Sequence, residues 1–236
     1  MKKRFVFLAA ALAAMLLTGC ALRTVEEMYA LPKRSEEFRE LQAAIDTAMY
    51  GMTYSSPQSG ENQQTVQTAD LNGDGLDEYL VFAKGATEKP LQVLIFQQDE
   101  TGKCRVLDTI GFNGQAFDQV EYMAFDDQPG LELVVGIQVS ERVLRNVAVY
   151  SFHGGSAELL LLNSYSKMLP CQLSGDKSEL MVLRPWEEET QRGMAVLYGY
   201  DKGQIVRSVE TELSEHTSRI RRITTGRLQD GNNAVF

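Results

Sequence analysis

The 236-residue chain is 44% hydrophobic and 23% charged, a composition typical of a folded globular protein rather than a disordered one. Its formal net charge of −9 at pH 7 argues against binding nucleic acid or an anionic lipid surface through charge. The length is sufficient for one large domain or two small ones.

The N-terminal segment carries the pattern of a bacterial lipoprotein signal peptide. Residues 2–4 are basic, residues 5–17 form an apolar run too short for a comfortable membrane span, and Leu-Thr-Gly-Cys at 17–20 resembles the lipobox. In lipoproteins the signal, here residues 1–19, is removed and the next cysteine is lipidated, which assigns that modification to Cys20. An ordinary secretory signal or an uncleaved anchor helix is the alternative.

This resemblance implies a location and a means of membrane attachment. The mature chain would begin at Cys20 and would lose three basic residues, which changes its net charge from −9 to −12. We therefore expect a protein at the extracytoplasmic face of a bacterial membrane, attached through acyl chains such as palmitate. Residues 20–34 would form a tether. Nucleic acid is not an expected partner.

One amphipathic helix is predicted over residues 35–51. Ser35 is a favourable N-cap, acidic residues occupy the first turn, and Gly51 ends the pattern. Apolar residues at three- and four-residue spacing form a single stripe: Phe38, Leu41, Ile45, Ala48 and Met49. Because this stripe needs a partner surface, we expect the helix to pack on the rest of the fold.

Short β-forming runs separated by Gly, Asp and Asn follow a predicted loop at residues 53–64. Strands are expected at residues 65–69, 78–83, 91–97, 104–110, 117–125, 132–139, 146–152, 158–162, 167–173, 179–183, 193–200, 205–209 and 220–227. Because no helical pattern interrupts them, residues 65–236 are predicted to form a mainly β domain. Its two cysteines, Cys104 and Cys171, could pair or could remain buried free thiols.

A repeated phrase indicates how these strands are organised. Glu78-Tyr-Leu-Val, Glu132-Leu-Val-Val and Glu179-Leu-Met-Val each place an acidic residue before an apolar run, and Asn233-Ala-Val-Phe is a fourth candidate copy. The copies begin 54, 47 and 54 residues apart, with about four strands in each interval. This spacing favours propeller-like four-stranded blades, each starting with a strand that lines the centre. A β-sandwich with coincidental spacing is the alternative.

Three complete units and a partial fourth do not close a ring, since propellers have four to eight blades. We therefore expect either a truncated sequence, which is the simpler explanation, or an open array of sheets.

The loop before the first of these runs has the spacing of a calcium site. Oxygen-bearing side chains occupy positions 1, 3, 5 and 9 of residues 70–78, and glycines occupy positions 4 and 6. Ca²⁺ requires six to eight oxygen ligands from a tightly turned loop, and this pattern can supply most of them. An EF-hand is excluded because position 12 is Val81 rather than Glu, and β runs flank the loop.

This loop and the strand after it resemble the FG-GAP and VCBS-type repeats of integrin-α-like propellers. The resemblance implies a structural Ca²⁺ bound by Asp70, Asn72, Asp74, Glu78 and the backbone carbonyl of Leu76. Together with the lipobox, the chain is similar to VCBS-repeat lipoproteins of anaerobic Gram-positive bacteria. The resemblance covers the chain from about residue 65 onward and is specific only at the first loop.

The later loops depart from this pattern. Residues 124–132 are one residue short if Gly130 is matched to Gly75, and they offer only Asp126, Asp127 and Glu132 as a weak second set of metal ligands. The loops at residues 173–179 and 228–233 have fewer acidic residues. We interpret all three later loops as turns that keep the geometry of the repeat and have lost the metal.

No catalytic set stands out in the sequence. His153 and His216 are expected to be solvated loop residues, and the acidic run at 187–189 beside Trp186 reads as an exposed loop. Arg219, Arg221 and Arg222 alternate with isoleucines, which predicts a strand with one basic face.

The sequence therefore favours a non-catalytic binding or scaffold module for a protein or a glycan. A polysaccharide-acting hydrolase or lyase is the alternative, and it would rest on analogy with other propellers.

Overall fold

The computed structural model describes residues 36–99, 101–140, 145–173, 177–187, 192–214, 216–229 and 232–236. The predicted signal peptide (1–19), the lipidation site Cys20 and the tether (20–34) lie outside these residues, as does the acidic pair at 188–189. The side chain of Trp186 is likewise outside the description. Within the described residues, no helix is long and apolar enough to cross a membrane.

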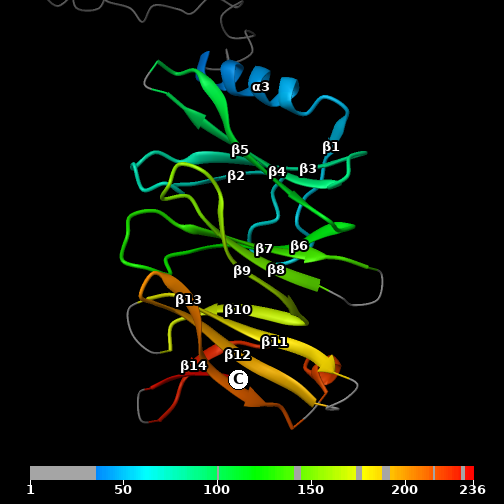
Figure 1. The fold of residues 1–236 in the computed structure, drawn as a ribbon, viewed down its shortest axis with the longest axis vertical. Helices are drawn as coiled ribbons and strands as arrows, with labels where there is room; N and C mark the ends of the chain where they lie inside the picture. Colours follow the sequence, from blue (N-terminus) through cyan, green and yellow to red (C-terminus); the bar gives the residue numbers. More distant parts are fainter. Residues whose placement is uncertain are drawn as a thin grey trace, which may run out of the picture.

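The predicted mainly β fold is confirmed (Figure 1). The described residues form an N-terminal helix, α3 (Glu36–Ala48), a short 3-10 helix, η1 (Thr217–Arg219), and four antiparallel sheets. Cys104 and Cys171, the two cysteines among the described residues, are free thiols; Cys171 is buried and Cys104 is half-buried.

Three of the sheets are four strand positions wide, and in each the strands follow one another in chain order. Sheet 1 contains β1 (Met52–Tyr54), β2 (Val66–Ala69), β3 (Glu78–Gly85), β4 (Leu91–Gln98) and β5 (Cys104–Phe112). Sheet 2 contains β6 (Ala116–Met123), β7 (Glu132–Gln138), β8 (Arg145–Ser151) and β9 (Glu158–Tyr165). Sheet 3 contains β10 (Lys167–Cys171), β11 (Glu179–Glu187), β12 (Arg192–Asp201) and β13 (Gln204–Glu212). A two-stranded sheet joins β14 (Thr225–Arg227) to β15 (Asn233–Val235).

The first strand position of sheet 1 is shared by two short strands. β1 pairs with residues 83–85 of β3, and β2 pairs with residues 78–81. Because β4 pairs with residues 79–84 along the other edge of β3, β1 and β2 must lie one after the other on the same edge. β1 was not predicted, because it falls within the polar segment that was expected to be a loop.

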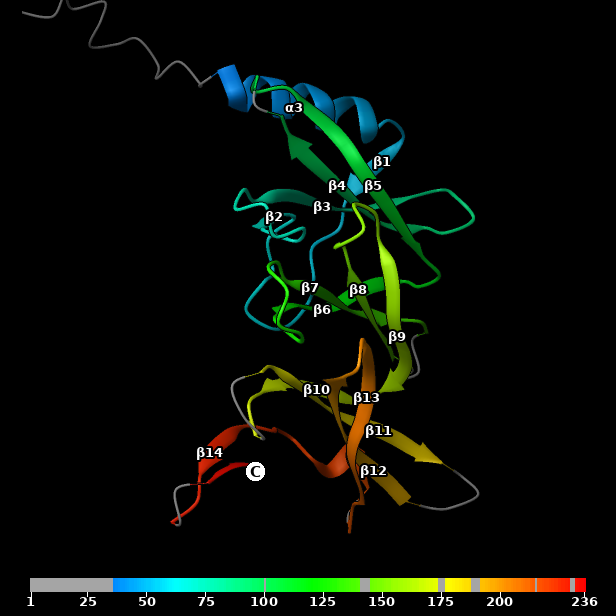
Figure 2. The same ribbon diagram turned by 60° about the vertical axis from the view of Figure 1, so that its left-hand side comes forward.

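The helix and the three sheets are stacked in chain order, with an apolar core between each pair of layers (Figure 2). Side chains of β3 alternate between two of these cores. Leu80 and Phe82 pack towards sheet 2, whereas Val81 and Ala83 pack towards α3 and its buried Ile45. This burial on both faces explains why the strand is apolar at successive positions, and it confirms that the helix packs on the β-sheets.

The repeated phrase marks a different strand from the one expected. Glu78, Glu132 and Glu179 begin β3, β7 and β11, which occupy the second position of their sheets. The strand before each loop, and not the strand after it, lies at the first position. The prediction that each glutamate begins the first strand of a sheet was therefore wrong by one strand. Each loop closes a hairpin within one sheet, and the boundary between sheets falls one strand earlier.

Two predicted boundaries also differ from the structure. The helix ends at Ala48 rather than at 51, and Gly51 follows in a left-handed turn with φ +76°. The strand expected at 220–227 is reduced to β14, which begins at Thr225. Residues 220–224 are irregular, and η1 lies just before them, with the Arg219 N–H bonded to the carbonyl of His216. The alternation of arginine and isoleucine meets no sheet edge there, so it produces no strand.

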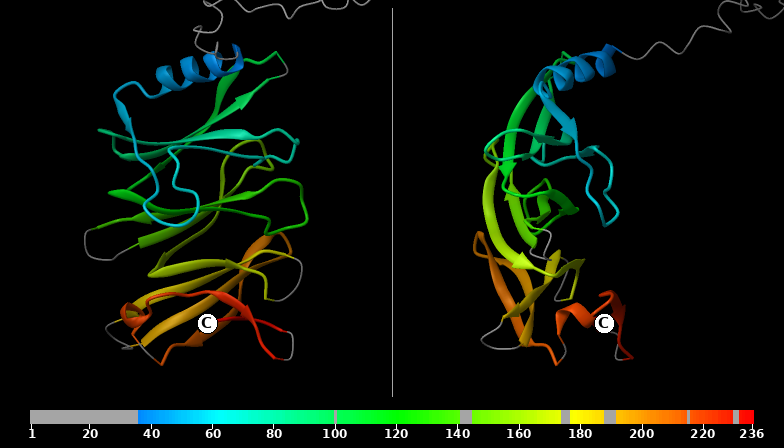
Figure 3. Two further views of the ribbon diagram at one scale, coloured as in Figure 1. Left: turned by 180° about the vertical axis from the view of Figure 1, so that it is seen from behind. Right: turned by 90° about the vertical axis from the view of Figure 1, so that its right-hand side faces the viewer.

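Two irregular segments run along the side of the stack where the first-position strands lie (Figure 3). In the segment after β1, the Ser59 N–H bonds to the carbonyl of Asp118 in β6 at 2.7 Å. In the C-terminal segment, the Asn233 side-chain amide donates to the carbonyl of Gln172, just after β10, at 2.8 Å. The segment after β1 therefore contacts the first-position strand β6, and β15 contacts the residue that follows β10.

Candidate functional site

Three equivalent loops join the first and second strands of the three large sheets. Loop 1 is residues 70–77, loop 2 is residues 124–131, and loop 3 is residues 172–178, of which 174–176 lie outside the described residues. Each ends at a buried glutamate whose carboxylate accepts a backbone N–H from the start of the same loop. The N···O distances are 2.9 Å for Leu71 to Glu78, 2.9 Å for Phe125 to Glu132 and 2.7 Å for Leu173 to Glu179.

For Glu78 and Glu132, the hydrogen bonds that the carboxylate accepts offset only part of the effect of burial on its pKa. Burial raises the pKa of Glu78, and the neighbouring charges of Asp74 and Asp70 raise it further, while the Leu71 N–H lowers it. Burial likewise raises the pKa of Glu132. The repeated glutamate seen in the sequence therefore has a structural role. Its carboxylate holds the turn of each loop through a hydrogen bond to the start of the same loop.

The loops are also joined to one another by a repeated hydrogen bond. The Leu131 N–H donates to the carbonyl of Asp70 at 2.9 Å, and the Ser178 N–H donates to the carbonyl of Ala124 at 3.0 Å. In both cases the residue before the glutamate of one loop bonds to the first residue of the previous loop. This contact is close, since a Cβ on Gly73 would lie 2.3 Å from the carbonyl oxygen of Pro129.

Alignment on the glutamates corrects the expected relation between loops 1 and 2. Both loops contain eight residues, so loop 2 is not one residue short. Gly130 occupies the position of Leu76, and Asp126 occupies that of Asn72. The expectation rested on matching Gly130 to Gly75, whereas Gly130 is required by the close approach of Leu71, whose carbonyl oxygen would lie 2.8 Å from an added Cβ.

Loop 1 brings together the four side chains proposed as calcium ligands. The Asn72 amide nitrogen donates to Glu78 Oε1 at 2.8 Å and to Asp74 Oδ2 at 3.1 Å. The two oxygens of Asp70 accept the N–H groups of Gly73 and Gly75, at 2.7 and 3.0 Å.

The chemistry of this donor set fits a hard cation. It contains three carboxylates and an amide, without nitrogen or sulfur ligands. The uncharged amide nitrogen of Asn72 donates to both Asp74 and Glu78, whereas a cation between these carboxylates would neutralise their charge. Cation binding through the oxygen of Asn72 would require its amide to turn.

Loop 2 brings together a different set from the one predicted. Asp126 and Glu132 lie beside His153, which follows β8, and His153 Nε2 is 3.3 Å from Asp126 Oδ2 and 3.3 Å from Glu132 Oε1. The His153 side chain is only 19% exposed, so the expectation of a solvated histidine was wrong. Asp127 points outward instead and pairs with Lys177 of loop 3 at 2.7 Å.

A signal for His153 was present in the pairing of β7 with β8. Leu133 is opposite Tyr150 in this hairpin, which places the residue before β7 and the residues after β8 at the same end. Recognising this required the hairpin register, which local sequence pattern does not give.

A basic cavity of about 320 Å³ lies at the opposite end of sheet 2 from loop 2. Four cationic side chains contribute to its lining: Arg145, Lys167, Arg221 and Arg222. Asp118, in the same lining, accepts a hydrogen bond from the Tyr165 hydroxyl and lies 3.1 Å from Arg145 Nε. Burial and the charge of Asp118 raise the pKa of Tyr165 far above its ordinary range, so this hydroxyl stays protonated.

The sequence did not identify this cavity because its residues come from distant segments. Asp118 is on β6, Arg145 begins β8, Lys167 begins β10, and Arg221 and Arg222 lie between η1 and β14. The two arginines were expected on a strand with one basic face, but they lie in irregular backbone.

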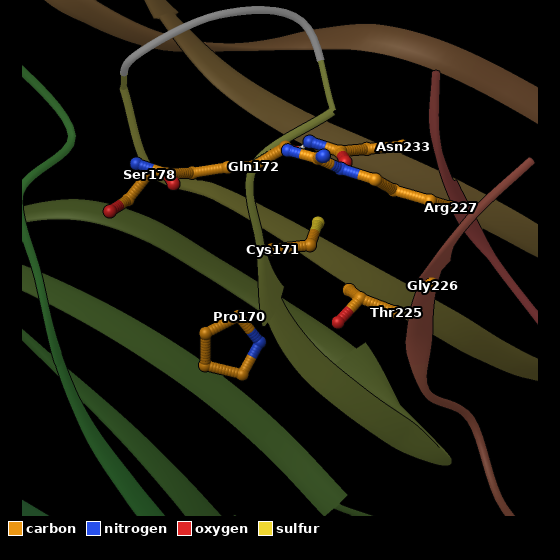
Figure 4. A pocket seen from close by; sticks show the side chains of 8 residues that line it. All are labelled: Pro170, Cys171, Gln172, Ser178, Thr225, Gly226, Arg227 and Asn233. Carbon is orange, nitrogen blue, oxygen red and sulfur yellow. Dashed lines mark hydrogen bonds between the residues drawn. The ribbon is translucent and has the colours of Figure 1, made fainter. Parts of the chain in front are cut away.

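A second cavity, of about 470 Å³, lies between β10 and the β14–β15 hairpin (Figure 4). Arg227 is the charged side chain in its lining, and Cys171 contributes a thiol. Burial, with a smaller effect of Glu179, raises the pKa of Cys171 to about 11, so the thiol is not activated as a nucleophile. This arrangement supplies no acid–base pair for catalysis within the described lining.

Comparisons with known proteins found no matching family model and no matching curated protein. Among solved structures, the chain is similar to a rhamnogalacturonan lyase of Bacillus licheniformis, with a TM-score of 0.45 and 13% identity. It is similar to the rhamnogalacturonan lyase YesW, with a TM-score of 0.45 and 14% identity. Each match covers 78% of this chain, which spans 40% of the length of each lyase.

Proposed function

We propose that this chain is a membrane-anchored, extracytoplasmic binding module whose basic cavity takes a carboxylate group of an acidic glycan. The observation that supports this most strongly is the gathering of four cationic side chains around a cavity of about 320 Å³ in a chain of net charge −9. The net negative charge of such a chain would repel an anionic ligand. A cavity lined by cations therefore marks the place where an anion could bind.

The positive charge of the cavity exceeds its internal negative charge. Asp118 is neutralised by Arg145, which also donates to the carbonyl of Ser166 at 3.2 Å. Within the described residues, no hydrogen bond or ion pair joins the side chains of Lys167, Arg221 or Arg222 to a protein group. These three cations are therefore available to an anionic ligand.

Arg145 balances the Asp118 carboxylate in the cavity lining. Its Nε is buried and lies 3.1 Å from Asp118 without an aligned hydrogen bond. The charges of the other three cations are therefore left to a ligand. The cavity is near the lower end of the size range of ligand pockets, which suits a single charged sugar unit.

The stacked sheets are, in this proposal, propeller-like blades in an open array. Support comes from the chain-ordered strands of each sheet, the glutamate that closes each loop, and the hydrogen bond between successive loops. These features repeat with the sheets, as in repeat proteins, in which each unit contacts only its neighbours.

Loop 1 would bind one structural Ca²⁺ through Asp70, Asn72, Asp74, Glu78 and the carbonyl of Leu76. The ion would replace the repulsion among three carboxylates by attraction and so would stabilise the contact between loops 1 and 2. Its role is structural, since loop 1 and the basic cavity lie at opposite ends of the sheets.

The calcium site can be tested by thermal unfolding of the full chain in detergent micelles. With an affinity of about 10⁻⁴–10⁻³ M, saturating Ca²⁺ should stabilise the wild type by about 1–3 kcal/mol. Asp74→Ala should abolish this effect. Asp77→Ala is the matched control, because Asp77 is exposed in the same loop and is not a proposed ligand. An equal response in both variants would refute the site.

The binding proposal can be tested by calorimetric titration of the same preparation with an acidic oligogalacturonate. The Arg221→Ala/Arg222→Ala double variant should lose at least about tenfold in affinity, because hydrogen bonds to charged groups contribute about 1.5–3 kcal/mol each. Lys103→Ala/Lys202→Ala removes the same charge from exposed positions outside the cavity and should bind like wild type. Cleavage of the oligosaccharide would overturn the non-catalytic role in favour of a polysaccharide-acting enzyme.

A further inference from the structure

We propose that Asp126, Glu132 and His153 form a binding site for a divalent transition metal such as Zn²⁺ or Mn²⁺. Asp126 lies in loop 2, Glu132 begins β7, and His153 follows β8. Their ligand atoms all lie within 4.8 Å of one another. The site is separate from the calcium loop and from the basic cavity, and it does not depend on the proposed function.

The spacing of the three side chains matches a metal site. Zinc–ligand bonds of about 2.0–2.1 Å at tetrahedral angles place neighbouring ligand atoms about 3.3 Å apart. His153 Nε2 lies 3.3 Å from Asp126 Oδ2 and 3.3 Å from Glu132 Oε1. These distances leave room for an ion between the nitrogen and the two oxygens.

Two atoms that face this space have no hydrogen-bond partner among the described residues. Glu132 Oε1 and His153 Nε2 are buried and make no hydrogen bond within the described residues. The Glu132 side chain is 1% exposed, and its other oxygen is fixed by the N–H of Phe125, so Oε1 is directed at His153. A buried polar atom without a hydrogen-bond partner is destabilising, and a metal bond would satisfy both of these atoms.

An imidazolium flanked by two carboxylates is the competing explanation, and the geometry disfavours it. One Nε2–H can point along only one line, yet both oxygens lie 3.3 Å away and neither is aligned for a hydrogen bond. Charge-assisted hydrogen bonds are shorter, at about 2.7–2.9 Å. A neutral imidazole with two carboxylates, in contrast, carries the −2 charge that a divalent ion balances.

The donor types select the class of metal. Ca²⁺ and Mg²⁺ take oxygen ligands, whereas an imidazole nitrogen combined with carboxylates suits first-row transition metals. Asp126 and Glu132 occupy the loop positions of Asn72 and Glu78 in loop 1. Loop 2 therefore keeps two of the oxygen positions, and His153 supplies a nitrogen in place of the others.

Sheet 3 contributes to the surroundings of the site. Tyr200, near the end of β12, lies beside Asp126, so that the two side chains interact. A side chain that interacts with a metal-binding carboxylate helps to fix its orientation. The ion would therefore link the two strands of the β7–β8 hairpin directly, and sheet 3 through Tyr200.

Metal titration of the full chain in micelles, after removal of metal by a chelator, tests this site. Wild type should bind one Zn²⁺ that Ca²⁺ does not displace, and Co²⁺ should give the visible absorption of a low-coordinate site with nitrogen and oxygen ligands. His153→Ala should weaken Zn²⁺ binding at least about 100-fold, since the loss of a mere supporting partner costs 10- to 100-fold. His216→Ala, at the other histidine of the chain, should leave the affinity unchanged.

Further variants keep the result interpretable if folding is affected. Glu132→Gln retains an acceptor for the Phe125 N–H and should lower the Zn²⁺ affinity while the circular dichroism stays that of wild type. Asp74→Ala in loop 1 should bind Zn²⁺ normally. Equal Zn²⁺ affinity in wild type and folded His153→Ala, or the absence of Zn²⁺, Mn²⁺ and Co²⁺ binding by wild type, would overturn the proposal.

Discussion

Single buried carboxylates determine much of the local geometry of this protein. Glu78, Glu132 and Glu179 each fix a loop through one backbone hydrogen bond, although the three loops share little sequence besides the glutamate. The same residue type accordingly serves a proposed calcium loop, a proposed transition-metal site and a third loop for which no metal is proposed.

Glu121, outside the proposed metal sites, allows the cost of a buried carboxylate to be measured. Burial raises its pKa above the ordinary 4.5, and the nearby Glu61 adds to this, although Gln119 donates to it at 2.8 Å. Because the folded pKa is higher than the unfolded one, the stabilising contribution is complete below pH 4.5 and is lost as the pH rises through the folded pKa.

Glu121→Gln should therefore stabilise the protein relative to wild type at pH 7 more than at pH 4. Urea unfolding at both pH values measures the difference. A variant whose gain is the same at both pH values would show that the carboxylate titrates normally in the folded state.

The elements of the fold could be predicted from the sequence to the extent that their signals are local. The apolar runs of β3, β4, β7 and β8 and the stripe of α3 were identified within a few residues, because both faces of these strands and one face of the helix are buried. Three features depend instead on long-range pairing: which strand begins each sheet, the presence of β1, and the irregular backbone at 220–224. Sequence pattern does not specify such pairing.

The same distinction explains which functional residues were predicted. Loop 1 lies within nine successive residues, so its four side chains could be placed together from spacing alone. His153 is separated from Glu132 by a complete hairpin, and the cavity joins Asp118 to Arg145 and Tyr165 from three different strands. Such sites become visible only when the strand register is known.

The contact between loops 1 and 2 should be sensitive to added volume. Gly73→Ala would place a Cβ 2.3 Å from the carbonyl oxygen of Pro129 at a φ of +77°, so we expect a loss of about 2–4 kcal/mol. Gly75→Ala is the matched control, since its φ is +85° but no atom lies within 4 Å. It should cost only about 1 kcal/mol.

Urea denaturation of both variants in excess chelator separates packing from any effect on calcium. Equal losses of stability in the two variants would mean that the close contact between loops 1 and 2 is not present in solution.

Across the whole molecule, the two ends of the strands in the stacked sheets differ chemically. The three loops, with the proposed calcium and transition-metal sites, lie where the first-position strands finish, whereas the basic cavity lies where β6, β8 and β10 begin. Metal ions at the first end would stabilise the stack without blocking the cavity at the other. In this proposal, the separation allows a metal-stabilised scaffold and a ligand site to coexist in an acidic protein.

The central claim is that the basic cavity recognises a carboxylated glycan. The most direct measurement is calorimetric titration of the full chain with an oligogalacturonate and with its methyl ester, which has the same sugar units without charge, each at low and high salt. We predict binding of the acid that weakens as salt screens the arginines, and no binding of the ester. Equal affinity for the acid and the ester, or no binding of either, would contradict the account.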